Sequence, residues 1–169
     1  MRKKPRKKKN SSKFLAVAIV VILIGISVYY FYSAEQAQIR GFGFGQELQL
    51  IQEQIHDEQT RFISSIAEWE EGTISDEEMI GIGEDHIKEF KTLLEKYHDL
   101  QPPDAFARSV KLFKLSLEYQ IESHEHRVEW IKSGDELELV RFQELTQLAF
   151  EAEQAGLKSF NDAKAGIEQ

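Results

Sequence analysis

The sequence predicts an all-α protein, in which a single N-terminal transmembrane helix precedes an antiparallel up-down-up-down four-helix bundle. Residues 14–32 carry no charged side chain, and nineteen helical residues extend about 28 Å, which matches the hydrocarbon core of a bilayer. Beyond residue 45 every apolar pattern has helical spacing, and none alternates at period two. Helix-breaking residues at Gly72, Pro102 and Gly134 divide that region into four amphipathic segments, which favours a bundle with short connections.

The N-terminal segments predict a cellular location. Residues 1–13 form a basic tail with eight of the 21 Lys and Arg residues and no acidic residue, so the positive-inside rule places this tail in the cytoplasm. The transmembrane helix, residues 14–32, runs from Phe14 to Tyr32, and the rest of the chain is expected outside. We therefore expect a single-pass cell membrane protein with membrane lipid as one partner.

A cleaved signal peptide is the alternative to this signal-anchor. Its apolar region usually spans about 7–15 residues and ends in small residues. Here the apolar run is longer, and cleavage after Ala34 would place the bulky Tyr32 three residues before the cut. The pattern therefore favours an uncleaved anchor.

Charge and cysteine content exclude several classes of function. Residues 33–169 contain 13 basic and 29 acidic side chains, a net charge of −16, which would repel the phosphates of nucleic acid. The chain has no cysteine, which excludes disulfides, thiolate metal sites and a cysteine nucleophile.

Residues 33–45 are predicted to be a Gly/Phe hinge, because Gly41-Phe42-Gly43-Phe44-Gly45 lacks the lysine and spacing of a phosphate loop. Residues 46–169 are predicted to be the extracytoplasmic acidic bundle. Its first helix ends at Gly72, and Ser75 and Glu78 form a capping box at the start of the second. Asp104 is expected to cap the third helix, and Ser133 with Glu136 to form a second capping box before the fourth.

Each helix has an apolar stripe that predicts the core. The stripes contain Leu48, Ile51, Ile55, Phe62, Ile66 and Trp69; Met79, Phe90, Leu93, Leu94 and Tyr97; Phe106, Val110, Phe113, Leu117, Ile121, Val128 and Ile131; and Leu137, Phe142, Leu145, Leu148, Ala149, Ala152, Gly156, Phe160 and Ala163.

Two Glu-x-x-His pairs are similar to the ligand pairs of di-iron bundles, but their helical positions argue against that chemistry. The pairs are Glu53 with His56 and Glu95 with His98. Glu53 and Glu95 are predicted to point to water, and the two pairs lie on consecutive rather than alternate helices. Glu122 and His126, four residues apart, could bind an ion only weakly at the surface. We expect no metal or other cofactor from these residues.

His86 and His124 differ, because each lies close to the middle of an apolar stripe and is predicted to face inward. A hairpin centred near residue 102 would offset them by about 9 Å along the axis, too far to share one ion. Met79 and His124 could instead ligate copper or haem. Met79, His86 and His124 are therefore candidate ligands, with ordinary burial as the alternative.

A second apolar stripe on the third helix predicts a partner interface. It consists of Leu112, Leu115, Tyr119 and Trp130, more apolar surface than a minimal bundle buries. The stripe would contact either a second copy of the chain, in a homodimer or coiled coil, or another envelope protein. Absorption of this stripe into one broad core is the alternative.

Together these patterns predict a non-enzymatic, membrane-anchored interaction or assembly module. No catalytic residues are assigned, because no nucleophile elbow or catalytic triad can be recognised. The alternatives are a bundle that binds haem or copper, and an accessory sensory domain that signals through a partner.

Overall fold

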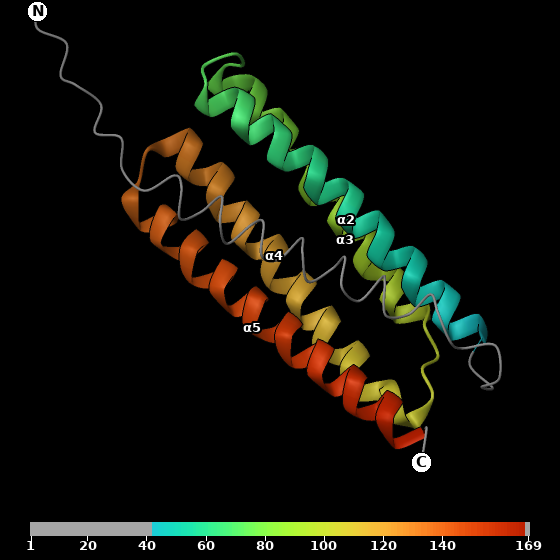
Figure 1. Ribbon diagram of the computed structural model, residues 1–169. Coiled ribbons are helices and arrows are strands. Elements are labelled where there is room, and N and C mark those ends of the chain that lie inside the picture. Colours follow the sequence, from blue (N-terminus) through green and yellow to red (C-terminus); the bar gives the residue numbers. More distant parts are fainter. Residues whose placement is uncertain (1–41, 168–169) are drawn as a thin grey trace, which may run out of the picture.

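The computed structural model describes residues 42–167, a range made of helices and their short connections, with no strand (Figure 1). Its elements are α2 (Phe42–Glu70), α3 (Asp76–Asp99), the 3₁₀ turn η1 (Asp104–Phe106), α4 (Ala107–Ser133) and α5 (Glu136–Ile167). The all-α helical bundle is confirmed for these residues. None of the described helices is long and apolar enough to cross a membrane. The predicted transmembrane helix, with Phe14 and Tyr32, lies outside the described residues.

The four helices lie side by side, each running opposite to the helix before it (Figure 1). α4 packs against both α3 and α5, and α2 packs against α3. Aromatic pairs across the core show that α2 and α4 are parallel, because Phe44 contacts Phe106 at one end and Trp69 contacts Trp130 at the other. The 71–75 turn and the 134–135 turn therefore share one end of the bundle.

α2 begins earlier than the sequence suggests. The helix starts at Phe42, four residues before the predicted start at Gln46, so Phe42–Gly45 is helical rather than part of a hinge. Phe44 is buried, and its ring lies 5.8 Å from that of Phe106. Burial of this aromatic ring stabilises helix over glycine's preference for irregular backbone.

The first predicted capping box is confirmed. The Ser75 hydroxyl accepts a hydrogen bond from the Glu78 N–H, and the Glu78 carboxylate accepts one from the Ser75 N–H. The hydrogen bonds to Ser75 lower the pKa of Glu78. Ile74 packs on the apolar cluster that contains Met79, as a hydrophobic staple would.

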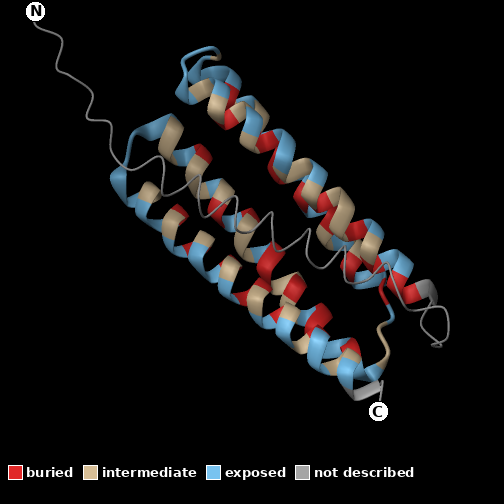
Figure 2. Ribbon diagram, in the orientation of Figure 1, coloured by how far each residue is buried: buried red, intermediate tan, exposed pale blue. Residues whose placement is uncertain are grey.

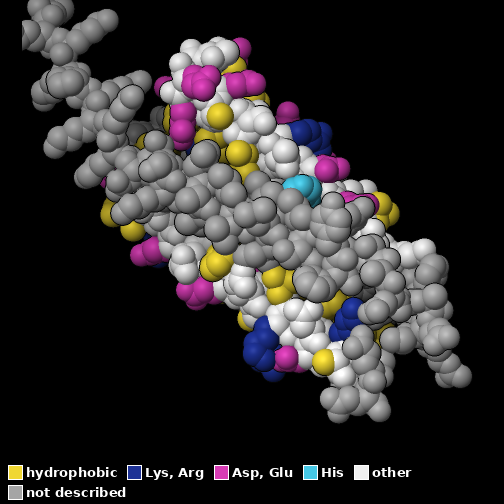
Figure 3. Space-filling view, viewed as in Figure 1, with side chains coloured by type: hydrophobic (Ala, Val, Ile, Leu, Met, Phe, Trp, Pro, Cys, Tyr) yellow, Lys and Arg dark blue, Asp and Glu magenta, His cyan; other side chains and the backbone are white. Residues whose placement is uncertain are grey.

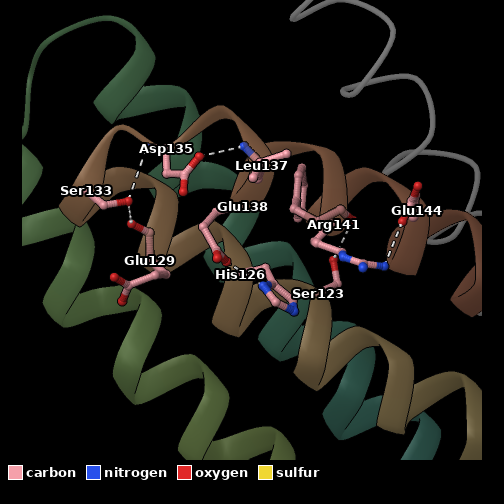
Figure 4. Close-up of polar contacts among 10 residues, drawn as sticks. Ser123, His126, Glu129, Ser133, Asp135, Leu137, Glu138, Arg141 and Glu144 are labelled. Atoms are coloured by element: carbon pink, nitrogen blue, oxygen red, sulfur yellow. Dashed lines mark hydrogen bonds and ion pairs between the residues drawn. The ribbon is translucent and has the colours of Figure 1, made fainter.

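The other two predicted caps are wrong. Asp104 starts the 3₁₀ turn η1, and neither η1 nor α4 has a side-chain cap at its N-terminus. At the start of α5 it is Asp135, not Ser133, whose side chain accepts from a helix N–H, that of Leu137 at 2.9 Å (Figure 4). Ser133 is the last residue of α4, and Gly134 caps that helix in the left-handed conformation (φ 71°) that glycine adopts readily.

α4 and α5 approach each other closely because small residues face each other at seven-residue spacing. Ser109, Ser116 and Ser123 of α4 are at most 2% exposed. The Ser116 hydroxyl donates to the carbonyl of Ala149 at 2.9 Å, and that of Ser123 to the carbonyl of Phe142 at 3.1 Å. These bonds satisfy buried hydroxyls and fix the register of the helix pair.

Most of the predicted core is buried and four of its residues are half-buried, while two residues on α5 are exposed. Buried residues line the inner faces of all four helices (Figure 2). Leu137 is 70% exposed and Leu148 is 41% exposed, although both were predicted to be core residues. Ala149, Ala152 and Gly156 are buried instead, and Leu148, next to Ala149 in sequence, therefore lies outside the buried face of α5.

Candidate functional site

Two imidazoles meet in the interior of the bundle, between α2, α3 and α4. The ring centroids of His86 and His124 are 4.7 Å apart, with their planes at 78°. His86 stacks on Phe62 at 4.0 Å and contacts Phe90 at 4.1 Å. His86 is therefore buried in the core, and His124, which is half-buried, turns its ring inward against His86.

Glu58 of α2 orients His86. Its carboxylate lies 3.0 Å from the His86 Nδ1 and also pairs with Arg61. The ionised carboxylate can only accept, so Nδ1 carries the proton and Nε2 of a neutral imidazole keeps its lone pair. That Nε2 is buried without a hydrogen-bond partner, as is the Nδ1 of His124.

Burial keeps both imidazoles neutral. It lowers the pKa of His86 to about 4, although the hydrogen bond to Glu58 acts in the opposite direction. Burial also lowers the pKa of His124, and the charges of His86 and Arg127 add to that effect. At neutral pH both rings present unprotonated nitrogens in an apolar environment.

Arg127 of α4 lies beside this histidine pair. Its guanidinium carbon is 6.0 Å from the centre of the Phe62 ring and 5.2 Å from that of Phe142. Its Nε is buried without a partner, and burial lowers the pKa of Arg127 to about 10. The aromatic faces therefore supply part of the stabilisation that water would give this cation.

The predicted offset of about 9 Å between the histidines is wrong. His86 meets His124, and Gly83 lies against Val128, so the α3–α4 hairpin is centred near residue 105 rather than 102. The extended Leu100–Pro103 segment and η1 move the centre toward α4. Met79, the third candidate ligand, packs with Phe62 and Ile66 in an apolar cluster.

Next to the histidine pair, a polar layer surrounds a small cavity of about 20 Å³. A cavity of roughly 10–15 Å³ by this measure holds one water molecule. Gln59 donates to Gln120, which donates to Ser116, and Gln52 donates to the Tyr97 hydroxyl. The polar side chains that line the cavity are Gln52, His56, Gln59, Tyr97, Ser116, Gln120 and Glu153.

Glu153 and His56 bring unpaired polar atoms to this layer. Glu153 is 8% exposed, its Oε2 has no partner, and burial raises its pKa to about 8. Burial, and secondarily the charge of Glu153, raises the pKa of Tyr97. His56 is half-buried, and its Nδ1 is buried beside the cavity without a hydrogen-bond partner. Sequence periodicity missed Glu153, which lies next to Ala152 at the margin of an apolar stripe.

The remaining histidines, His98 and His126, lie nearer the surface and pair with glutamate side chains. The His126 ring points to Glu138 of α5 rather than to Glu122 (Figure 4). His98 is exposed and pairs with Glu95 at 3.3 Å. Among the described residues, no group of three or more His, Cys, Asp and Glu could hold a metal ion.

The charges of the bundle are unevenly distributed between its ends. Residues 56–87 and 120–145, at the end with the 71–75 turn, carry 17 acidic and 4 basic side chains, a net charge of −13. Residues 42–55, 88–119 and 146–167 carry 10 acidic and 8 basic side chains, a net charge of −2. We call these the acidic end and the mixed end. Figure 3 shows acidic side chains gathered around the 71–75 turn.

The predicted interface stripe is partly covered within the monomer. Leu112, Leu115, Tyr119 and Trp130 are all half-buried, and the Trp130 ring packs edge-on against Trp69. The large apolar side chains that the described residues expose most are instead Leu50, Leu137, Val140 and Leu148. Leu137 and Val140 belong to the acidic end.

Comparisons of this chain with protein-family models, curated proteins and solved structures give no match.

Proposed function

We propose that this chain is a non-enzymatic, membrane-anchored interaction module, whose acidic end binds a positively charged protein partner outside the cytoplasm. The observation that carries the proposal is the division of charge between −13 at the acidic end and −2 at the mixed end. Of the 17 carboxylates at the acidic end, four form ion pairs with Lys or Arg among the described residues, those of Glu58, Glu84, Glu125 and Glu144. Such a field attracts cationic partners and accelerates their association.

The uneven distribution of charge along the bundle is compatible with a membrane anchor at residues 14–32. α2 begins ten residues after Tyr32, so the mixed end would lie near the bilayer and the acidic end would project away from it. A helix of 29 residues extends about 44 Å, several times the screening length of roughly 8 Å at physiological salt. The dense negative charge would thus stand clear of anionic lipid headgroups.

Two exposed side chains add an apolar component to the acidic end. Leu137 is 70% exposed and Val140 is 46% exposed, and they lie one helical turn apart on α5. Charge attraction mainly increases the rate of encounter, whereas burial of such side chains slows dissociation. A partner segment that combines basic and apolar residues fits both features.

Topology can be tested directly because the chain has no cysteine. Variants N10C and L137C would be treated on intact cells with a membrane-impermeant maleimide. We expect L137C to react on intact cells and N10C to react only after lysis. Labelling of N10C alone on intact cells, or release of the C-terminal domain into the medium, would contradict the anchored arrangement.

Partner binding can be tested with a photo-crosslinking amino acid at Leu137, in native membranes, with Leu50 as the matched exposed position at the mixed end. We expect a discrete adduct from position 137 that weakens between 0.15 and 1 M salt, roughly as screening shortens the reach of charges. Replacing Glu129 and Glu136 by Gln should weaken the same adduct. An identical adduct from position 50, or none from position 137, would overturn the proposal.

A further inference from the structure

Two polar atoms that line the cavity beside the histidine pair have no hydrogen-bond partner. They are the Oε2 of Glu153, on α5, and the Nδ1 of His56, on α2. Glu153 is 8% exposed, and buried polar atoms in native proteins nearly always have partners. A cavity of about 20 Å³ holds one group the size of a water molecule. A single ligand in this cavity would therefore reach both atoms.

We infer that this cavity is a binding site for a primary ammonium group, which donates hydrogen bonds to Glu153 Oε2 and His56 Nδ1. The group belongs either to a small free amine or to a lysine side chain of another protein, because both end in the same chemistry. The site is distinct from the exposed carboxylates of the acidic end and does not depend on the proposed function.

The other polar side chains of the cavity already donate to neighbours. Gln59 donates to Gln120, which donates to Ser116. Gln52 donates to the Tyr97 hydroxyl. The two atoms that remain without partners are an oxygen that accepts when its carboxyl group is ionised and an imidazole nitrogen that accepts when it carries no proton. A group that only donates fits both, and an ammonium group is such a donor.

The carboxyl group of Glu153 favours a cation over water as the ligand. Three glutamines already line the cavity, and a fourth amide at this position would hold a water molecule without the cost of burying an ionisable group. Among the described residues no Lys or Arg lines the cavity, so an entering cation would meet no competing charge of its own sign there. Buried ionisable groups in clefts are frequent at functional sites.

A ligand can enter the cavity between α2 and α5. In the part of the chain that the structure describes, these two helices do not pack closely against each other. The side chains of His56, Gln59 and Gln120 at the cavity are only half-buried. Rotation of these side chains would open a path to Glu153.

Binding at neutral pH must release a proton. Burial raises the pKa of Glu153 to about 8, so the free site holds a neutral carboxyl group at pH 7. The ammonium group keeps its N–H bonds and pairs with the carboxylate, while the carboxyl proton passes to solvent. His56 of α2 and Tyr97 of α3 are the other titratable groups that line the cavity, and α4 contributes no charged or titratable side chain to the lining.

The test is a calorimetric titration of the full-length chain in uncharged detergent micelles with methylammonium, at pH 7 and pH 9 and physiological salt. K⁺ and tetramethylammonium, which have no N–H group, are the control cations. E153Q removes the charge with little change of shape, and E151Q removes an exposed carboxylate of the same helix as the matched control. Titration in two buffers with different ionisation enthalpies counts the protons released, and circular dichroism shows whether each variant keeps its helical content.

We expect one methylammonium per chain, about one proton released at pH 7, and about tenfold tighter binding at pH 9, where Glu153 is already ionised. E151Q should bind as the parent does. E153Q should bind at least about tenfold more weakly at pH 9, because the charged acceptor is lost. Binding of Nα-acetyl-lysine methylamide as well would show that the site admits a lysine side chain, and its exclusion would restrict the site to small free amines.

Three results would overturn the inference. The first is failure of the parent chain to bind methylammonium. The second is equal binding of K⁺ or tetramethylammonium, which would show attraction by charge alone. The third is unchanged binding by a folded E153Q variant.

Discussion

Replacing Glu153 by Gln is expected to stabilise the fold at neutral pH and to remove much of its pH dependence between pH 4.5 and 8. The carboxyl group is buried and its Oε2 has no hydrogen-bond partner. Burial raises its pKa from 4.5 to about 8. Below pH 4.5 the group is protonated in both the folded and the unfolded chain, so it adds no pH dependence there.

Between pH 4.5 and pH 8 the Glu153 carboxyl group has lost its proton in the unfolded chain but keeps it in the folded chain. Stability then falls as pH rises, by about 1.4 kcal/mol per pH unit, because the folded state binds more protons. Across the whole interval the loss approaches about 5 kcal/mol, which is comparable with the total stability of many domains. Above pH 8 the carboxyl group is ionised in both states, and the difference becomes constant.

The assay is urea unfolding of the full-length chain in micelles, followed by circular dichroism from pH 4 to 9. The difference in free energy of unfolding between E153Q and the parent isolates Glu153, since all other titrating groups are common to both. It should be small at pH 4.5, favour the variant increasingly up to pH 8, and then level off. A difference that does not change with pH would refute the assignment of Glu153 as a buried neutral acid.

Five further substitutions, at four positions, test the packing and one helix cap in the same unfolding assay. Gly83→Ala should lower the free energy of unfolding by about 1–3 kcal/mol, because the added Cβ would lie 2.6 Å from a methyl of Val128. Gly81→Ala, with open space around the added Cβ, should instead raise it by about 0.5–1 kcal/mol. Equal effects of the two substitutions would contradict the close approach of α3 to α4. Ser75→Ala should cost about 1 kcal/mol through loss of the N-cap, whereas Ser75→Asp should retain most of the stability. Phe44→Ala should lower the free energy of unfolding by about 3–5 kcal/mol, because the Phe44 ring is buried in the core. An effect near zero would show that residues 42–45 form a hinge, as the sequence predicted, and not the first turn of α2.

The helix caps illustrate how far local sequence was sufficient. The Ser75 box depends on residues three apart, and both its hydrogen bonds formed as predicted. Ser133 has the same spacing to Glu136, yet Asp135 accepts from the first turn of α5 instead. Ser133 remains the last residue of α4, where its hydroxyl donates to the carbonyl of Glu129, so Asp135, directly before α5, is the residue that caps it.

The sequence by itself determined the helices and the inward direction of His86 and His124, because 3.6-residue periodicity is a local property of the chain. Only the tertiary structure decided which residues meet across helices. The connection at Leu100–Phe106 set the α3–α4 register and so brought the two imidazoles to 4.7 Å, while the burial of Ala149 on α5 left the neighbouring Leu148 exposed. Glu153 likewise became a neutral buried acid because other helices removed it from water. The register between two helices and the removal of water from a side chain both depend on contacts with segments that are distant in sequence. The pattern of one helix therefore does not specify them.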